Sequence, residues 1–555
     1  MKTTFSYDHY YKYDEVKNNL EYFADTYPDL AKLEVNCVSE EGRNQYVITL
    51  TNTKTGDALS KPALYIDGNI HAGEVTSTMC AMHTVDYLLT NYGTDPEVTK
   101  LLDTKTFYVI PRVSPDGSEK YLTSPYTLRS APRPYNVEKG GMVSEDLDDD
   151  GVIRMMRIPT PYGAWKIDAD GDMVFRDPGD TDGTFYDIYP EGYLEAYDGD
   201  ENLKAKKAVW GLDFNRNFPF GWFPDARQPG AGKYPLSNVE NKALVDFALA
   251  HNNIGGAAIG HTSGGLLLYP PGTRPSTSAP SQDIKAFKAI AQMGVEELGY
   301  VPMNIFDTFM SDQVNYDSGA FDDWFYQSQG IPAYTMEFWD VSSKAGKPHV
   351  YNGKPEDPYV QLERFNAVMK WVKQNAPQYY SDWKSYEHPT FGTVEIGGLN
   401  CKFTLQNPPE EYLLAECEHD TKFNIRFAKA LPQLTVDSVT SEKVSEDVYK
   451  VSAVIGNLGY LPTHLTDEAI NLHTAVEVEV SIDKEVVEGH AVKKIGHLSG
   501  YSRTATGAIY GNLTTYASAK AKNKVTWIIK AHQGETVTVS ASQEKAGSCT
   551  ATITL

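Results

Sequence analysis

Residues 62–74 read PALYIDGNIHAGE, and the fold class follows from this stretch. Its first half is an apolar run, Pro62 to Ile66, which predicts a buried strand. His71 and Glu74 then fall on the turn that leaves the carboxyl end of that strand. Open α/β sheets bind their ligands at such turns. The stretch therefore predicts an α/β protein with a functional site at this edge of its sheet.

A third metal ligand is needed, because His-x-x-Glu pairs occur in many proteins without a metal. His261 offers one, since it follows another apolar segment, Ala257-Ala258-Ile259. Two imidazoles and one carboxylate suit zinc and leave its fourth position open for water. Glu337 lies in a further apolar and aromatic run, where an ionised side chain is costly without a partner or a chemical task. A salt-bridged core glutamate is the alternative interpretation of Glu337.

A series of motifs runs along the chain in the order Glu41-Gly42-Arg43, His71-Ala72-Gly73-Glu74, Ser114-Pro115-Asp116-Gly117, Gly211-Leu212-Asp213-Phe214-Asn215-Arg216-Asn217, His261, Asp323-Trp324 and Glu337. This series resembles the zinc metallocarboxypeptidases of the carboxypeptidase A and B type. The resemblance extends from residue 5 to about residue 385. It implies the fold of that family, a mixed eight-stranded α/β sheet with helices on both faces, in agreement with the alternation of predicted strands and helices.

The resemblance also implies the catalytic roles. His71, Glu74 and His261 become the ligands of one zinc ion, which lowers the pKa of its water and polarises the scissile carbonyl. Glu337 becomes the general base, which later hands its proton to the leaving amine. Asp213 matches the carboxylate that orients the first zinc-binding histidine.

Substrate-binding residues follow in the same way. Asn215 and Arg216 match the pair that grips the free terminal carboxylate of the substrate, a task that suits a planar guanidinium. Arg43 resembles the outer arginine that draws this carboxylate in. Tyr316 resembles the mobile tyrosine that closes over the substrate, although it lies one residue out of register with Glu337.

Arg129 is the best match to the arginine that stabilises the oxyanion, since it lies twelve residues past Gly117. Arg133, Arg154 and Arg157 are its rivals, and a solvated loop arginine is the alternative interpretation.

Asp322 occupies the position that faces the terminal side chain of the substrate in this family. That residue is apolar in enzymes of the A type and an aspartate in those of the B type, so the resemblance implies a preference for basic terminal residues. The alternative is that Asp322 caps the helix that begins near Asp323.

Composition limits the function classes. The chain has 555 residues, 41% of them hydrophobic, and its 50 basic and 74 acidic residues give a net charge of −24. Nucleic acids and anionic membranes are unlikely partners, because they require clustered Lys and Arg. Without a long apolar stretch, membrane insertion is not expected either. No secretion signal opens the chain, so we expect a cytoplasmic protein or a secreted protein whose signal has been removed.

Sequence character changes along the chain. We expect a catalytic domain at 1–385, a connecting segment at 386–430 and an all-β sandwich at 431–555, where period-two alternation predominates. An insertion at about 131–209 interrupts the catalytic domain. Sixteen acids against four bases between residues 145 and 200 give this insertion a net charge of −12.

Part of this insertion resembles a calcium loop. Asp146, Asp148 and Asp150 before Gly151 fit positions 1, 3, 5 and 6 of an EF-hand-type loop, but Arg157 replaces the bidentate Glu at position 12. A second cluster, Asp168, Asp170 and Asp172, is able to supply the missing oxygens. A solvated acidic loop is the alternative.

The sequence therefore predicts a zinc-dependent carboxypeptidase that acts on the carboxyl termini of peptides or proteins. A zinc amidohydrolase acting on cell-wall peptides or N-acylated amino acids is the second hypothesis, because Asn215 and Arg216 serve either substrate. A non-catalytic peptide- or glycan-binding protein is the third. The presence of Glu337 together with a full ligand set favours an enzyme.

Overall fold

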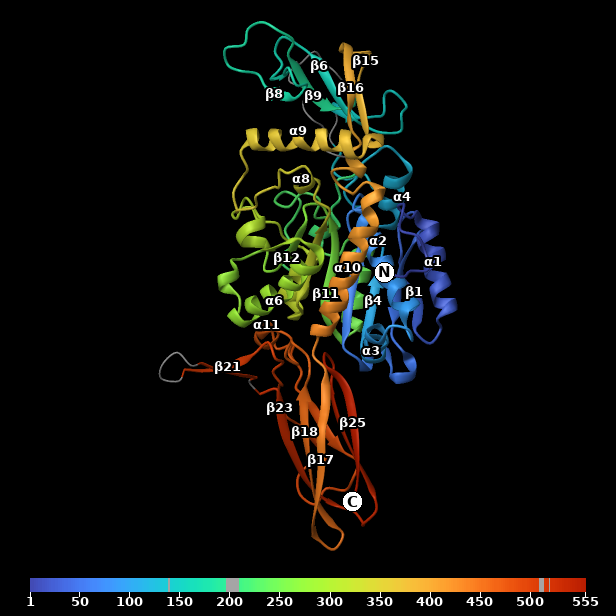
Figure 1. The fold of residues 1–555 in the computed structure, drawn as a ribbon, viewed down its shortest axis with the longest axis vertical. Helices are drawn as coiled ribbons and strands as arrows, with labels where there is room; N and C mark the ends of the chain where they lie inside the picture. Colours follow the sequence, from blue (N-terminus) through green and yellow to red (C-terminus); the bar gives the residue numbers. More distant parts are fainter. Residues whose placement is uncertain (138–139, 196–208, 509–513, 519) are drawn as a thin grey trace.

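The computed structural model describes residues 1–137, 140–195, 209–508, 514–518 and 520–555 (Figure 1). Residues 138–139 and 196–208 of the predicted insertion, and 509–513 and 519 of the predicted sandwich, lie outside the described residues.

An eight-stranded mixed sheet forms the centre of the molecule, as predicted. β3, β4, β11 and β14 run parallel to one another, while β1, β2 and β12 add antiparallel pairings. All residues of the central strands β3 and β11 are buried, as expected for strands covered on both faces. In spatial order the strands are β1 (Ala31–Val38), β2 (Asn44–Leu50), β4 (Thr106–Ile110), β3 (Ala63–Gly68), β11 (Ile254–Thr262), β14 (Ala333–Phe338), β12 (Leu266–Tyr269) and β13 (Val301–Asn304).

Helices surround this sheet (Figure 1). α10 packs against both α2 and α6, and α2 and α10 both contact β3 and β11. Among the described residues, none of the helices combines the length and the apolar character needed to cross a bilayer. The helices are α1 (Tyr13–Thr26), α2 (Val75–Asn91), α3 (Pro96–Thr104), α4 (Pro115–Thr123), α5 (Val239–Ala250), α6 (Ser281–Leu298), α7 (Phe321–Gln329), α8 (Val341–Lys344), α9 (Pro358–Asn375), α10 (Glu410–Ala430) and α11 (Asp467–Asn471).

Residues 386–430, expected as a connecting segment, contain α10, which lies in the main hydrophobic core. Phe423 and Phe427 of this helix are fully buried and pack edge-on against Tyr334 of β14. Gly256 of β11 permits this close approach, because an added Cβ would lie 2.7 Å from the Phe427 ring. α10 is therefore part of the main hydrophobic core and does not act as a linker.

The acidic insertion contributes strands to a second sheet, at the top of Figure 1. The hairpin β15 (Tyr380–His388) and β16 (Gly392–Leu399) pairs with the inserted strands through β6. A small core that includes Met156 and Ile396 lies beneath them. The sheet order is completed by β6 (Met155–Pro159), β9 (Tyr186–Pro190), β7 (Trp165–Ile167) and β8 (Met173–Phe175), and a separate pair is formed by β10 (Gly192–Glu195) and β5 (Gly141–Ser144).

The C-terminal region consists of antiparallel sheets, as predicted. Val451 and Trp527 of one sheet share a hydrophobic core with Val480 and Val539 of another. Alternate residues of each strand supply this core, which explains the period-two pattern of the sequence. The strands are β17 (Leu434–Ser445), β18 (Val448–Asn457) and β23 (Lys522–Lys530) in one sheet, β20 (Val492–Lys494), β19 (Glu479–Ile482), β24 (Thr536–Gln543) and β25 (Gly547–Thr554) in the next, and β21 (Thr504–Ala508) with β22 (Thr514–Ser518) in a pair.

Phe427→Ala tests the place of α10 in the core. Truncating a fully buried ring should lower the free energy of unfolding by about 3–5 kcal/mol, because it leaves a cavity beside Gly256. Leu414→Ala, on the same helix and 45% exposed, should change it by less than about 0.5 kcal/mol. Urea unfolding followed by circular dichroism measures both, and equal effects would contradict this packing.

Candidate active site

The carboxyl ends of the parallel strands β3 and β11 lie side by side at the predicted site. His71 lies on the turn after β3 and Glu74 immediately precedes α2, while His261 is part of β11. Asn69 shapes the turn with a positive φ of 64°, a conformation that asparagine tolerates, and its side-chain amide donates to the carbonyl of His71 at 2.7 Å. The turn thus directs His71 and Glu74 toward the neighbouring strand end.

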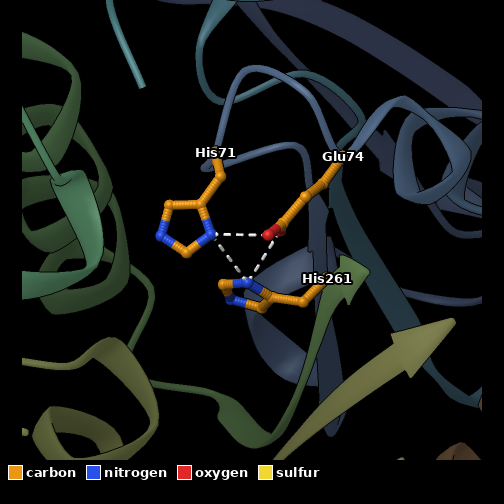
Figure 2. A group of neighbouring side chains, drawn as sticks. All are labelled: His71, Glu74 and His261. Carbon is orange, nitrogen blue, oxygen red and sulfur yellow. Dashed lines mark hydrogen bonds and ion pairs between the residues drawn. The ribbon is translucent and has the colours of Figure 1, made fainter. Parts of the chain in front are cut away.

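These three side chains converge on one point (Figure 2). His71 Nδ1 lies 2.9 Å from Glu74 Oε1, and His261 Nδ1 lies 2.9 Å from Glu74 Oε2. The two Nδ1 atoms are 3.2 Å apart. Each of the three residues is at most 3% exposed, so their polar atoms interact mainly with one another and with neighbouring side chains.

The donor set fits a zinc ion. His71 Nε2 lies 3.1 Å from Asp213 Oδ1, so this nitrogen carries the proton and leaves a lone pair on Nδ1. Burial would lower the pKa of His261, but the Glu74 carboxylate raises it to about 9. Burial would raise the pKa of Glu74, yet His71 and His261 lower it. The site therefore favours added positive charge, which a dication supplies.

Asp213 links the histidine to an arginine. Its Oδ2 accepts from Arg129 Nε at 2.8 Å and its Oδ1 accepts from the backbone N–H of Asn215 at 2.8 Å. Burial would raise the pKa of Asp213, but Arg129 and His71 hold it well below its usual value. Arg129 Nη1 also lies 3.8 Å from Glu74 Oε1. A charged Asp213 therefore positions both the ligand His71 and the guanidinium of Arg129.

The rival arginines lie elsewhere. Arg133 pairs with Glu240 and Glu40, Arg154 pairs with Asp150, and Arg157 pairs with Glu395 and stacks on Trp383. None of the three lines the cavity described below, whereas Arg129 does. The geometry thus favours Arg129 for the oxyanion role.

Glu337 lies beside His71, Glu74 and His261, the metal-ligand trio, but is not one of the converging side chains. In the parallel pairing of β11 with β14, it is the register partner of His261. Burial raises its pKa to about 7; His261 opposes this rise and Glu74 adds to it. This placement suits a proton carrier more than a salt-bridged core glutamate.

A cavity of about 150 Å³ opens beside the trio. The predicted substrate residues Asn215, Arg216 and Asp322 all line it. The side-chain oxygen of Asn215 accepts from the backbone N–H of Phe321 at 3.0 Å. The side-chain Nδ2 group of Asn215 takes no part in that hydrogen bond. The cavity is lined by His71, Arg129, Asn215, Arg216, His261, Leu268, Ile305, Phe309, Met310, Asp317, Ala320, Asp322, Asp323, Thr335 and Glu337.

Asp322 does not cap its helix. α7 begins at Phe321 with Ala320 as the N-cap residue, so Asp322 lies inside the first turn. Its Oδ2 accepts from the hydroxyl of Thr335 at 2.8 Å, and its Oδ1 accepts from the backbone N–H of Asp323 at 2.7 Å. The capping alternative is therefore wrong, and the carboxylate lies on the cavity wall.

Two predicted residues lie outside this wall. Arg43, in the turn between β1 and β2, donates to Glu41 at 2.7 Å and to Asp116 at 3.1 Å. Tyr316 packs against Phe223, and the Arg227 guanidinium lies 5.0 Å from its ring. Neither contacts the cavity as the structure has it, so their roles toward a substrate stay predictions.

The predicted calcium ligands do not all converge. Oxygen atoms of Asp146 and Asp148 lie within 4.8 Å of one another and of the buried Glu191, which sequence reasoning missed. Asp150 instead accepts from Arg154 Nε at 2.8 Å. Asp172 of the second acidic cluster pairs with Lys370. Calcium binding in the insertion stays a prediction.

Sequence reasoning also missed Asp317 and Asp323 as wall residues. Asp317 follows Tyr316, and its proximity to Arg216 depends on the path of a loop that no motif marks. Asp323 was part of the Asp-Trp motif but had no assigned role.

Comparisons with known proteins place the chain in a family. A family model described as zinc carboxypeptidase matches residues 16–350, and a model for a domain of unknown function matches residues 433–554. Mouse carboxypeptidase D is 31% identical over 112 residues, which cover 20% of this chain and 8% of that protein. Mouse carboxypeptidase A2 is 23% identical over 340 residues, which cover 61% of this chain and 64% of that protein.

The chain thus spans less than two thirds of the length of either relative. Among solved structures, that of thrombin activatable fibrinolysis inhibitor is 18% identical with a TM-score of 0.41 and covers 67% of this chain and 76% of that one.

Asp213→Asn tests the link between Asp213 and the metal. The amide can no longer fix the His71 tautomer by its charge, so zinc affinity should fall about 10- to 100-fold. Competition with a chelator measures the affinity. Asp420→Asn is the matched control: burial raises the pKa of Asp420 to about 8, so a neutral amide should leave zinc affinity unchanged. Equal affinities in the two variants would contradict the assignment.

Proposed function

The chain belongs to the zinc carboxypeptidase family, and from this premise we propose that it is a zinc-dependent metallocarboxypeptidase acting on peptides or proteins. It removes the residue at the carboxyl terminus. One observation carries the proposal: His71 and His261, which converge on Glu74, line a single cavity together with Glu337, Arg129 and the pair Asn215-Arg216.

The residues divide the chemistry between them. His71, Glu74 and His261 would hold zinc, which when bound polarises the scissile carbonyl and activates water. Glu337 takes the proton of the attacking water and passes it to the leaving amine. A pKa raised to about 7, chiefly by burial, lets one carboxyl group both accept and release a proton near neutral pH.

Arg129 stabilises the charge that develops on the carbonyl oxygen. Asp213 accepts from the Nε of this guanidinium, so the Nη1 and Nη2 groups are not used by that hydrogen bond. A fixed donor costs little reorganisation when the oxyanion forms. Asn215 and Arg216 bind the terminal carboxylate of the substrate and so place the last peptide bond at the metal.

Glu337→Gln tests the base. Turnover should fall by about 10²–10⁴-fold because the amide cannot carry the proton, while zinc content and melting temperature stay close to those of the native protein. Hydrolysis of blocked dipeptides and metal analysis measure these quantities. Near-normal activity in the variant would contradict the assignment.

Turnover and zinc content of the native protein distinguish the other two hypotheses. Turnover confined to N-acylated amino acids or cell-wall peptides would favour the amidohydrolase. Stoichiometric zinc without any turnover would favour a binding protein.

Asp322 supports a preference for basic terminal residues. Its carboxylate is 4% exposed and lies on the cavity wall beside Thr335. Among the described residues, no lysine or arginine forms a hydrogen bond or ion pair with Asp322, whose partners are Thr335 and the backbone N–H of Asp323. A lysine or arginine side chain would therefore pair with Asp322, whereas an aromatic one would leave the carboxylate desolvated.

A panel of otherwise identical peptides ending in Arg, Phe and Glu tests this preference. The native protein should cleave the Arg peptide most efficiently. Asp322→Ala should reduce kcat/KM for that peptide by about 10-fold or more and leave the Phe peptide unchanged or improved. Preferred cleavage of the Phe peptide by the native protein would refute the idea, as would an Arg preference that survives the substitution.

A further inference from the structure

Arg216, the proposed partner of the substrate carboxylate, already contacts a carboxylate of its own chain. Its Nη2 lies 2.8 Å from Asp317 Oδ2. Its Nη1 donates to the backbone carbonyl of Asn215 at 2.9 Å. A guanidinium presents its donors as a fork suited to one carboxylate at a time. In this structure Asp317 takes that place.

The two partners differ in how firmly they are held. The Arg216 side chain is 14% exposed, and its backbone is packed against Gly319, where an added Cβ would lie 2.5 Å from the Arg216 carbonyl oxygen. The Asp317 side chain is 42% exposed, and Arg216 is its one hydrogen-bonding or ionic partner among the described residues. Asp317 is therefore the member of the pair that can move.

Asp317 also has space to move into. It lines the 150 Å³ cavity and a larger adjoining cavity of about 590 Å³. The larger one is polar at this point, with Asn315 and Lys354 on its wall. A displaced carboxylate can be solvated there without losing its charge.

The acidic residues of the smaller cavity favour such a displacement. Asp317, Asp322, Asp323 and Glu337 all line it, against the guanidinium groups of Arg216 and Arg129. A further carboxylate entering beside Arg216 would meet Asp317 at close range, and like charges repel strongly in a poorly solvated site.

We propose that Asp317 is a specificity-determining residue that competes with the terminal carboxylate of the substrate for Arg216. This inference rests on the proposed carboxypeptidase function. Substrate binding replaces the internal ion pair by an equivalent one, so Arg216 contributes less net affinity for a free carboxyl terminus than an unpaired arginine would. Discrimination between free and amidated termini is correspondingly reduced.

Asp317→Asn tests the competition, because the amide keeps the shape and removes the charge. The substrates are a blocked dipeptide with the terminal residue that the native protein cleaves best, and the same dipeptide with its terminal carboxylate amidated. For the free acid, KM should fall about fivefold, because that is the change in affinity expected from losing one partly exposed competing ion pair. Its kcat should stay within about twofold, and KM for the amide should not change.

Asp312→Asn is the matched control on the same loop. Asp312 Oδ1 accepts from the backbone N–H groups of Val314 and Asn315, and an asparagine oxygen can accept these two bonds. The variant loses only the bond from the Asn315 side-chain amide to Oδ2. The substitution Asp312→Asn removes one negative charge but no contact of Arg216. The ratio of the KM values for the acid and the amide should therefore stay that of the native protein. An equal change in both variants would show a general charge effect and overturn the proposal.

The remaining outcomes separate this inference from the proposed function. A native protein that holds zinc but cleaves neither substrate refutes the function itself. A native protein that cleaves, combined with an unchanged or raised KM for the acid in Asp317→Asn, refutes the competition and indicates that Asp317 only supports Arg216. Melting temperature and zinc content of each variant identify any loss of folding.

Discussion

Parallel pairing of β3, β11 and β14 is the constraint on which the site depends. Because parallel strands end at the same edge of a sheet, the turn after β3 and the end of β11 deliver the metal-ligand trio to one point. The β11–β14 register then sets Glu337 directly beside His261. A slip of one residue would turn every side chain of a strand to its other face. The buried apolar runs that prevent such a slip are thus as necessary to the arrangement of the site as the three converging side chains themselves.

Burying this many ionisable groups is costly, and the structure meets the cost by pairing them. Asp213 has three donors, from His71, Arg129 and a backbone amide, so its charge persists despite burial. Glu74 is balanced by two imidazoles. Glu337 has no hydrogen-bond or ion-pair partner among the described residues, and burial raises its pKa to about 7. The number of nearby donors thus separates Asp213, a carboxyl group that stays charged, from Glu337, one whose pKa rises.

The strand-end residues could be predicted from the sequence because apolar runs and turns mark where a buried strand stops. The eight-stranded sheet followed from the family resemblance and from the alternation of strands and helices. Arg43 and Tyr316 are different, because both lie on turns or loops whose paths are set by partners such as Asp116 and Arg227. Asp317 was missed for the same reason.

Long-range packing was the other unpredictable element. α10 was assigned to a connecting segment, because Asn407-Pro408-Pro409-Glu410-Glu411 suggested a break. Its burial depends on facing α2 and α6, which lie far away in the sequence. The pairing of β16 with β6 joins residues more than two hundred positions apart, and no local pattern encodes it.

A chain of hydrogen bonds ties the cavity wall to the C-terminal region. Asp323 accepts from Gln327 at 2.5 Å, Gln327 accepts from Arg274 at 2.8 Å, and Arg274 pairs with Glu468 of α11 at 2.9 Å. Burial and the neighbouring Asp322 raise the pKa of Asp323 to about 7, so its charged form depends on these donors. Because each member satisfies the next, α11 helps to hold the wall in place. The region after the main sheet thus supports the cavity wall, although none of the described residues of that region lines the cavity.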